Sequence, residues 1–588
     1  MVDKNQVEKI FQNFKLIDNK FKESRLRRWH SCFAIGVLLS LGQLMGYAHP
    51  RQSLRPDFAA HLEIRVERSD TGELMPARVY LFKEDKPFRL SPVESHLPLR
   101  VDTFYRDQIW HRSEKPKTLE VTAKDESHFI LLEGQAMFDL PAADKYRLEI
   151  YRGFFYKPVV KEFSLEAEKT LRITASLTPI ASSYQQQWLS GDVHIHLLRE
   201  KEDDNVFLRW LQAEDLSVGN FLELQRQQHA AKQYAYGSEG EARLSNYSIR
   251  SGHESRSHFY GHTIFLGPEE MIRPLSVGSE LANTPEAYPF PTLLFRKARA
   301  LGAIRGFAHL QLYPDGFPHT TLLMNLARNT IDFVEVFQFG NLALNKWYEL
   351  LNAGFRVVGL AGSDFPVSLI VSRPLEGGWP RSIPLLGPER SLVKAVSEES
   401  AYQAWAAGVR QGDVVLTNGP LLEFSANGNS SGAVLEWSSQ SYAVQGTATA
   451  VSYRPIEKIE IVINGEVVAR KSGDEISTSI SLDYDVLIDE SSWIAARVKA
   501  SSNSQEPQIW AHTNPIYLLR DGQPVYIEAD RNAIRELWEK ESSYYKSPLL
   551  VFKKEEQRRE FLKLIEETSS ILEGPQPSWI RKERLDVK

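Results

Sequence analysis

Cysteine is almost absent from this sequence, which contains only Cys32. A single thiol cannot close an internal disulfide, and it cannot supply the several sulfur ligands of a cysteine-bound zinc site. Any metal centre in this chain must therefore be built from histidine and carboxylate side chains.

The sequence also lacks a large excess of charge of one sign, because 70 basic and 76 acidic residues leave a net charge of only −6. Proteins that bind nucleic acid usually carry a strongly basic surface or domain. The balance therefore predicts no nucleic-acid partner. The remaining composition, with 42% hydrophobic and 25% charged residues, is that of an ordinary globular protein.

Long apolar runs are scarce as well. The run over residues 33–48 is interrupted by Gln43 and is shorter than the roughly 20 residues that a membrane-spanning helix needs. It follows the basic stretch KESRLRR and ends in small residues around Ala48, which is typical of a secretory signal. We predict a signal peptide over residues 1–48, and the alternative is an uncleaved N-terminal anchor. The mature protein would then be periplasmic or secreted, with envelope association through this segment.

The length of 588 residues predicts several domains. Residues 49–182 alternate apolar and polar side chains, which predicts an antiparallel β-sandwich. Residues 183–420 alternate short apolar strands with helical segments, which predicts an α/β domain with parallel strands. Residues 421–522 return to a β pattern, and residues 523–588 form a helical tail. The predicted fold class is therefore multidomain α/β plus β.

Local patterns support these elements. Asp-Thr-Gly at 70–72 separates two alternating runs and predicts a β-hairpin, and so does the turn Asn464-Gly465. In the tail, one helical face carries Phe561, Leu562, Ile565 and Leu572, and we expect this face to pack against the body of the protein.

Two histidines separated by one residue follow an apolar run in the segment WLSGDVHIHL. In a strand, His194 and His196 share a face, so that both imidazoles project into one volume. The same pattern also occurs in surface strands without a metal. Eight of the 15 histidines, however, fall between residues 194 and 319. His309 and Asp364 each end an apolar strand in the α/β domain, where active sites collect.

With these residues in place, the chain resembles the CehA/McbA-type metallohydrolases of the PHP (polymerase and histidinol phosphatase) superfamily. The resemblance extends over nearly the whole mature chain and depends on the order of the segments WLSGDVHIHL, GHESRSHFYGHTIFLG, ALGAIRGFAHL, FRVVGLAGSD and VVLTNGPLLEF. It implies a distorted (β/α)7 barrel, flanked by β-sandwich-like domains, with metal ions at its mouth.

The resemblance also implies a ligand set. One metal ion would be held by His194, His196, Glu254 and Asp364, and a second by Glu254, His262 and His309, with Glu254 bridging. Glu254 and Asp364 are the implied catalytic carboxylates. The family's third ion lacks its ligands, because Leu222 and Pro366 occupy positions where the family has histidine. We therefore predict two divalent ions, and the ligand types suit zinc, manganese or iron.

Two carboxylate-bridged ions activate water against ester-type bonds, which predicts a hydrolase. The resemblance implies phosphoester, carboxylic ester or carbamate bonds in a small-molecule or polymer substrate. Asp192 or Glu335 could orient a ligating histidine. Candidate substrate-binding residues are His258, His319, Arg373 and Arg381. The alternative function is a metal-containing envelope protein that binds a partner with little or no turnover.

Overall fold

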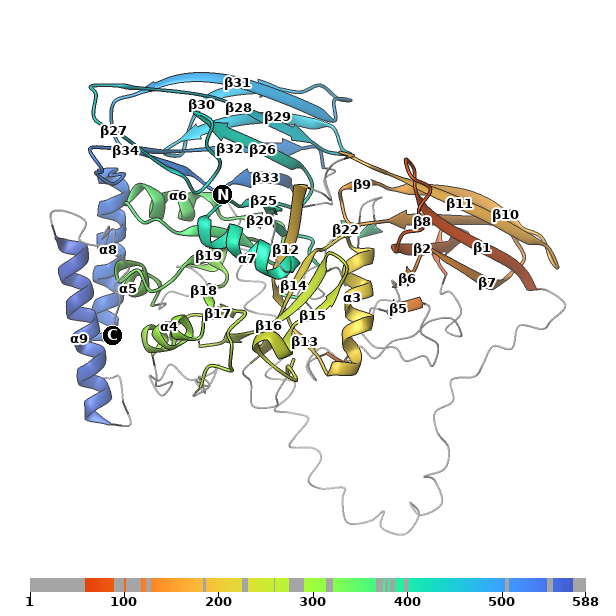
Figure 1. Cartoon of the computed structure of the whole chain (residues 1–588), viewed down its shortest axis with the longest axis horizontal. Helices are drawn as coiled ribbons and strands as arrows, with labels where there is room; N and C mark the ends of the chain where they lie inside the picture. Colours follow the sequence, from red (N-terminus) through yellow and green to blue (C-terminus); the bar gives the residue numbers. More distant parts are fainter. Residues whose placement is uncertain are drawn as a thin grey trace, which may run out of the picture. The chain divides into compact units, whose positions relative to one another are not determined.

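The computed structural model describes residues 59–88, 100–101, 118–122, 128–182, 187–224, 231–257, 260–273, 290–313, 321–365, 374–375, 379–380, 386–395, 400–502, 507–546, 552 and 554–574 (Figure 1). The described residues all belong to one compact unit, Ala59–Lys588. The predicted signal segment, residues 1–48, therefore lies outside the described residues. None of the described helices has both the length and the apolarity needed to span a membrane.

Two sheets form the N-terminal β region. The first has the order β7-β1-β11-β9 and the second has the order β10-β8-β2-β6-β5, with β3 at the side of β2. Their strands are β1 (Ala59–Arg68), β2 (Ala77–Lys83), β3 (Lys86–Pro87), β5 (Thr118–Thr122), β6 (His128–Leu132), β7 (Gln135–Pro141), β8 (Ala143–Tyr151), β9 (Tyr156–Lys157), β10 (Val159–Leu165) and β11 (Thr170–Pro179). Alternate residues of β1 are fully buried between the sheets, as the period of a half-buried strand requires.

The prediction that the two runs flanking Asp70-Thr71-Gly72 pair as a β-hairpin is wrong, because β1 and β2 belong to different sheets. A single bridge, Glu67–Leu74, joins its arms, after which β1 continues in one sheet and β2 in the other. Pro76 lies between the bridge and β2, and proline has no N–H to donate to a ladder. The region is also not purely antiparallel, because β1 pairs in parallel with β11.

Seven described strands of the central region pair in a closed order: β12 (Trp188–Ile195), β14 (Val218–Leu224), β16 (Tyr247–Ser255), β17 (Thr263–Leu266), β18 (Ile304–Phe307), β19 (Phe333–Gln338) and β21 (Val358–Ala361). A parallel bridge between Ile195 and Phe365 joins the end of the last strand to the first. Most neighbours are parallel, as predicted, but β17 runs antiparallel to both β16 and β18. Carboxyl ends of the parallel strands therefore share one edge, where polar side chains can meet.

Helices connect or flank these strands: α3 (Asp204–Ala213), α4 (Pro291–Ala300), α5 (Leu322–Ala327), α6 (Leu344–Asn352) and α7 (Ala401–Gln411). The ends of α7 show why the chain forms a helix here. The Ser400 hydroxyl accepts a hydrogen bond from the backbone N–H of Gln403 at 3.2 Å, which caps the first turn. Gly412 then ends the helix in a left-handed conformation with φ of 78°.

Short elements complete the central region: β4 (Arg100–Val101), β13 (Leu197–Leu198), β15 (Ala242–Leu244), β20 (Asn341–Leu342), β22 (Pro374–Leu375), β23 (Trp379–Pro380), β24 (Arg390–Lys394), β25 (Val415–Thr417) and the 3-10 helices Lys201–Asp203, Gly237–Gly240 and Leu310–Leu312. The strand β24 pairs with β12 on the side away from β14, and β25 pairs with both β24 and β33 (Ile509–Thr513). Strand pairing thereby runs without interruption from the central region into the C-terminal β region.

The C-terminal strands are β26 (Leu421–Ala426), β27 (Val434–Trp437), β28 (Tyr442–Val451), β29 (Ile456–Ile463), β30 (Glu466–Ser472), β31 (Ser479–Ile488), β32 (Ser492–Ala500), β33 and β34 (Ile516–Arg520). The predicted Asn464-Gly465 hairpin is present, because β29 and β30 pair antiparallel across these two residues, whose φ values are 50° and 95°.

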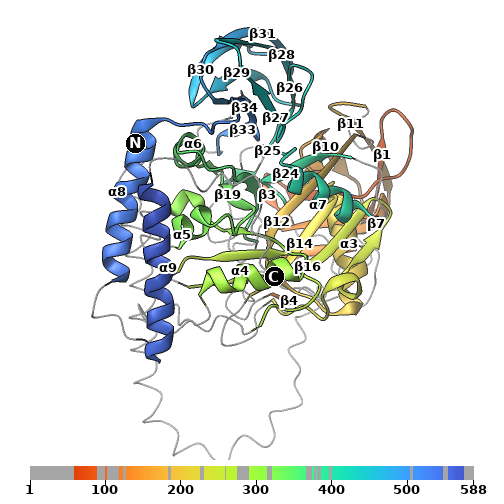
Figure 2. The same cartoon turned by 60° about the vertical axis from the view of Figure 1, so that its left-hand side comes forward.

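The tail forms two helices, α8 (Glu528–Tyr545) and α9 (Glu555–Glu573), which lie side by side in both views (Figures 1 and 2). The predicted apolar face of α9 is buried at Phe561, Ile565 and Leu572, and Leu562 is partly buried. Phe561 packs against Tyr260 and Phe290 of the central region, with ring centroids 5.7 Å and 4.7 Å apart. The described chain thus combines an α/β region with β regions, which agrees with the predicted fold class at this level.

Candidate metal centre

The structure brings the six predicted ligands together at the ends of neighbouring strands. They come from the end of β12, the end of β16, the residue before β17, the turn after β18 and the turn after β21. Each has at most 9% of its surface exposed: His194, His196, Glu254, His262, His309 and Asp364. These residues are far apart in the sequence, so that only the closed order of the strands places them in one buried cluster.

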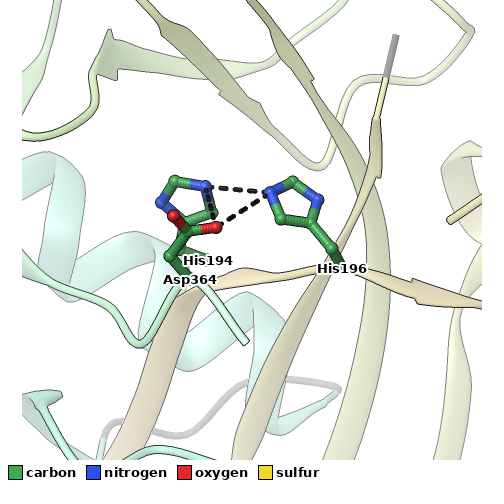
Figure 3. Close-up of side chains that lie close together, drawn as sticks. All are labelled: His194, His196 and Asp364. Atoms are coloured by element: carbon green, nitrogen blue, oxygen red, sulfur yellow. Dashed lines mark hydrogen bonds and ion pairs between the residues drawn. The ribbon is translucent and has the colours of Figure 1, made fainter. Parts of the chain in front are cut away.

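His194, His196 and Asp364 form the first part of the cluster (Figure 3). The Nε2 atoms of the two histidines lie 3.0 Å apart, and Asp364 Oδ1 lies 3.5 Å from the first and 3.4 Å from the second. The Nδ1 of His196 faces the backbone carbonyl of Leu222 at 3.0 Å, so that this nitrogen carries a proton and donates to the carbonyl. The other ring nitrogen, Nε2, faces the cluster.

Glu254, His262 and His309 form the second part. Glu254 Oε1 lies 3.0 Å from His262 Nδ1 and 3.6 Å from His309 Nε2. The other oxygen of the same carboxylate, Oε2, lies 3.2 Å from His196 Nε2 in the first part. Oε1 also lies 3.7 Å from His194 Nε2 of the first part, so that the Glu254 carboxylate lies between the two parts, as a bridging carboxylate must.

The donor atoms fit a cation better than they fit one another. Glu254 Oε1 and Asp364 Oδ1 are buried, and within the described residues they accept no hydrogen bond. Ligands about 2.1 Å from a tetrahedral ion lie about 3.4 Å apart, and the nitrogen–oxygen distances around these oxygens are 3.0–3.7 Å. A buried polar atom without a partner is costly. A divalent cation among these atoms would remove that cost.

Glu335 on β19 holds two of the rings. Its Oε1 lies 3.0 Å from His194 Nδ1, and its Oε2 accepts the backbone N–H of His309 at 2.9 Å. His309 Nδ1 faces Gln338 Oε1 at 2.7 Å. With Nδ1 engaged in this way, each ring directs Nε2 toward the cluster. The predicted orienting contact of Glu335 is thus present, whereas nothing in the sequence had indicated Gln338.

Close packing makes glycine necessary beside this carboxylate. A Cβ on Gly362 would lie 2.6 Å from Glu335 Oε1 and 2.8 Å from the Cβ of His194. Any side chain at this position would displace the carboxylate or the strand that carries the histidine. The absence of a side chain at Gly362 therefore leaves room for Glu335 to contact His194.

Within the described part of the chain, the Asp192 carboxylate does not contact a histidine ring, and it binds backbone N–H groups instead. Its carboxylate accepts the backbone N–H groups of His194, Ser363 and Gly387 at 2.9, 3.0 and 3.0 Å. Burial raises its pKa to about 6, against the opposing effect of these hydrogen bonds. Asp192 thus ties β12 to the loops that follow β21, and it contacts no imidazole among its described partners.

Two of the clustered residues have a strained backbone. His309 has φ of 61° and Asp364 has φ of 49°, both in the left-handed region that residues with a Cβ rarely adopt. Such conformations persist where the surroundings over-determine them, and they are concentrated at functional sites. Both residues terminate a strand, and the left-handed turn aims the side chain back into the cluster.

The carboxylates demand a positive charge at this place. Burial lowers the pKa of His194, but Glu335 and Asp364 outweigh it and raise the pKa well above its ordinary value. At the edge of the cluster, burial lowers the pKa of His262 to about 3, so that this ring is neutral and available as a ligand. A cluster that draws a proton onto one buried histidine is equally suited to a metal cation.

Arg256, like Gln338, is a residue of the centre that the sequence does not indicate. It leaves β16 two residues after Glu254 and is 5% exposed. Its Nε donates to Glu254 Oε2 at 2.5 Å, and its Nη2 lies 3.5 Å from Asp364 Oδ1. In the sequence, an arginine between two serines resembles an ordinary loop residue, because its partners are a close neighbour and a residue more than a hundred positions away.

The other candidate residues either do not contact this cluster or are not among the residues that the structure describes. His258, His319, Arg373 and Arg381, predicted to bind substrate, lie outside the described residues. His253 precedes Glu254 in β16 and therefore faces the opposite side. Its ring packs on Phe265 with centroids 4.7 Å apart, and burial lowers its pKa to about 3. Leu222, at the position of the missing third-site ligand, is fully buried in an apolar cluster.

Comparisons with known proteins do not assign a family. No protein-family model matches the chain, and no curated protein matches it. Solved structures with some similarity include PsfC from Pseudomonas syringae, 14% identical, with TM-score 0.25 over 37% of this chain and 87% of that one. The lesion-specific endonuclease EndoQ from Pyrococcus furiosus is 14% identical, with TM-score 0.24 over 38% of this chain and 56% of that one. A minor pilin of Streptococcus agalactiae is 14% identical, with TM-score 0.14 over 21% of this chain and 46% of that one. At these TM-scores the similarities identify neither a family nor an activity.

Proposed function

We propose that this chain is a metal-dependent hydrolase of ester-type bonds, with two divalent ions held in a PHP-like barrel of the CehA/McbA type. The observation that carries the proposal is the position of Glu254. Its Oε2 lies 3.2 Å from His196 Nε2, and its Oε1 lies 3.0 Å from His262 Nδ1, 3.6 Å from His309 Nε2 and 3.7 Å from His194 Nε2, so that one carboxylate contacts both groups of nitrogen ligands. A bridging carboxylate between two imidazole sets is typical of dinuclear hydrolytic centres.

Each part of the cluster has an assigned task in this proposal. His194, His196 and Asp364 hold one ion, His262 and His309 hold the other, and Glu254 contacts both. When bound, such a pair of ions activates water and polarises an ester or phosphoryl oxygen. Glu335 keeps His194 and the backbone of His309 in place, so that the ligand atoms stay oriented without an ion.

The remaining features of the proposal come from the sequence. Residues 33–48 support export to the periplasm or secretion, and the mild net charge supports a partner other than nucleic acid. Phosphoesters, carboxylic esters and carbamates are the candidate substrates, and His258, His319, Arg373 and Arg381 are the proposed substrate contacts. The ion identity is open among zinc, manganese and iron.

Metal content tests the proposal directly. We expect the purified protein to bind close to two equivalents of Mn²⁺ or Zn²⁺ per chain, measured by equilibrium dialysis and elemental analysis. The double substitution His194→Ala, His196→Ala should abolish binding to the first ion. His253→Gln is the matched control, since this buried histidine on β16 precedes Glu254 and faces away from the cluster.

Turnover separates a hydrolase from a binding protein. Aryl phosphate, aryl ester and aryl carbamate substrates should be screened with each added ion, and we expect hydrolysis of at least one that is lost in the double variant. Metal content unaffected by the double substitution would refute the assigned ligands. Metal binding without turnover on any of the three classes would favour the alternative of a metal-containing binding protein.

A further inference from the structure

Arg256 places a fixed positive charge inside the ligand cluster. Its guanidinium donates to Glu254 Oε2 and lies near Asp364 Oδ1, so that it contacts both carboxylates assigned to the metal ions. The side chain is almost fully buried, and a buried guanidinium is tolerated only when anions compensate it. Here the compensating anions are the proposed metal ligands themselves.

We infer that Arg256 is a positioning residue that serves as a built-in counter-ion of Glu254 and Asp364 and thereby limits how many divalent ions the cluster holds. The inference rests on the proposed function, because it concerns ions bound by those carboxylates. It adds a residue to the centre that neither the sequence pattern nor the comparisons had indicated.

Charge and geometry both support this role. The guanidinium donates to Glu254 Oε2 and lies 3.5 Å from Asp364 Oδ1, and these two oxygens also face His196 Nε2 at 3.2 and 3.4 Å. The Glu254 oxygen that accepts from the arginine is less available to a further metal ion. A positive charge in a water-excluded site also repels a divalent cation more strongly than it would in solvent. With Arg256 present, fewer divalent ions are needed to neutralise the negative charge of Glu254 and Asp364 than without it.

Fixed charge from Arg256, unlike that of an ion, is not lost to a chelator. The counter-ion therefore remains beside Glu254 and Asp364 in the metal-free protein.

Substitution of Arg256 by an uncharged side chain of similar length tests the inference. Full-chain protein stripped by a chelator would be titrated with Mn²⁺, and bound metal measured by dialysis and elemental analysis. We expect Arg256→Met to bind its weaker ion at least about tenfold more tightly than the wild type and to take up an additional equivalent in excess Mn²⁺. Arg256→Lys, which keeps the charge, should restore the wild-type affinity and stoichiometry.

Arg305→Met is the matched control. Arg305 is 3% exposed, lies on β18 and makes two hydrogen bonds of 2.9 Å to Asp332. Its loss should lower stability without changing metal affinity or stoichiometry. If Arg256→Met fails to fold, Arg256→Gln, which retains a hydrogen-bond donor, carries the same expectation.

The outcomes distinguish this inference from the proposed function. Unchanged or weaker metal binding by a folded Arg256→Met or Arg256→Gln variant would overturn the counter-ion role while leaving the metal centre intact. Failure of the wild type to bind any ion would instead overturn the proposed function. Tighter binding in the uncharged variants, restored by lysine, would support both.

Discussion

At the residue scale, the direction of two ligand atoms depends on one buried carboxylate. Glu335 contacts the Nδ1 of His194 and the backbone N–H of His309, so that a single side chain supports both parts of the cluster. Glu335→Gln preserves the shape but removes the charge that favours a proton on Nδ1. We expect metal affinity to fall by about 10- to 100-fold, measured by competition with a chelator of known affinity.

The control for this substitution is Glu541→Gln, another buried carboxylate that lies on α8 and contacts Tyr313 rather than a histidine. It should leave metal affinity unchanged. Equal affinity of the Glu335→Gln variant and the wild type would mean that Gln338 and the strand backbone suffice to orient the rings.

The proximity of the six histidine and carboxylate side chains could be anticipated from their positions at strand ends, but the contacts around them could not. The sequence pattern placed His194 and His196 on one face, and strand order placed His309 and Asp364 nearby. Arg256 and Gln338 gave no signal, because their significance depends on atoms brought near by the closed strand order. Asp192 was considered for a ring contact, yet its short side chain reaches backbone N–H groups instead.

At the element scale, buried ion pairs join the N-terminal β region to the turn after α3. Arg78 on β2 donates to both oxygens of Glu214 at 3.1 Å, and these side chains are 3% and 2% exposed. Nearby, Arg152 lies 3.3 Å from Asp215. Arg390 donates to the backbone carbonyls of Glu214 and Asp215, and the same residue contacts the carbonyl of Gly387. Gly387 in turn donates to Asp192, so that the turn is linked to the base of the ligand strand.

Removal of one partner of the Arg78–Glu214 pair should be costly. Arg78→Met leaves the Glu214 carboxylate buried without this cation, and we expect the free energy of unfolding to fall by about 3–5 kcal/mol in chemical denaturation. The double variant Arg78→Met, Glu214→Leu should recover most of that loss, since no uncompensated charge remains. A single-variant loss below about 1 kcal/mol would show that the pair contributes no more than a surface ion pair.

Strand direction is the element-scale feature that the sequence did not predict. Alternation of strands and helices favours parallel pairing, but the connections on either side of β17 reverse its direction relative to β16 and β18. His262 directly precedes β17 and enters the cluster from the start of this strand. Because β17 is antiparallel, its amino end lies at the same edge as the carboxyl ends of its neighbours, which is why a residue before a strand joins residues that follow strands.

At the scale of the whole molecule, the C-terminal tail is attached to the central region through a buried acid. The Tyr313 hydroxyl, a few residues after His309, donates to Glu541 Oε1 on α8 at 2.8 Å. Glu541 is 2% exposed, and Tyr545 on the same helix packs on Phe561 of α9 with centroids 5.3 Å apart. Burial raises the pKa of Glu541 well above its ordinary value, and the hydrogen bond from Tyr313 opposes this only in part.

This raised pKa predicts the pH dependence of stability. Between the ordinary glutamate pKa of about 4.3 and the raised value, the unfolded chain releases the proton while the folded chain retains it. The free energy of unfolding therefore falls as pH rises through this window, by about 1.4 kcal/mol for each unit of the shift. Glu541→Gln keeps the acceptor for Tyr313 and removes the titration. In chemical denaturation, we expect its stability relative to the wild type to increase from pH 5 to pH 8, with protection of α8 from hydrogen exchange following the same trend. A wild-type-to-variant difference that is constant across this range would show that Glu541 titrates at its ordinary pKa and does not make the attachment of the tail depend on pH.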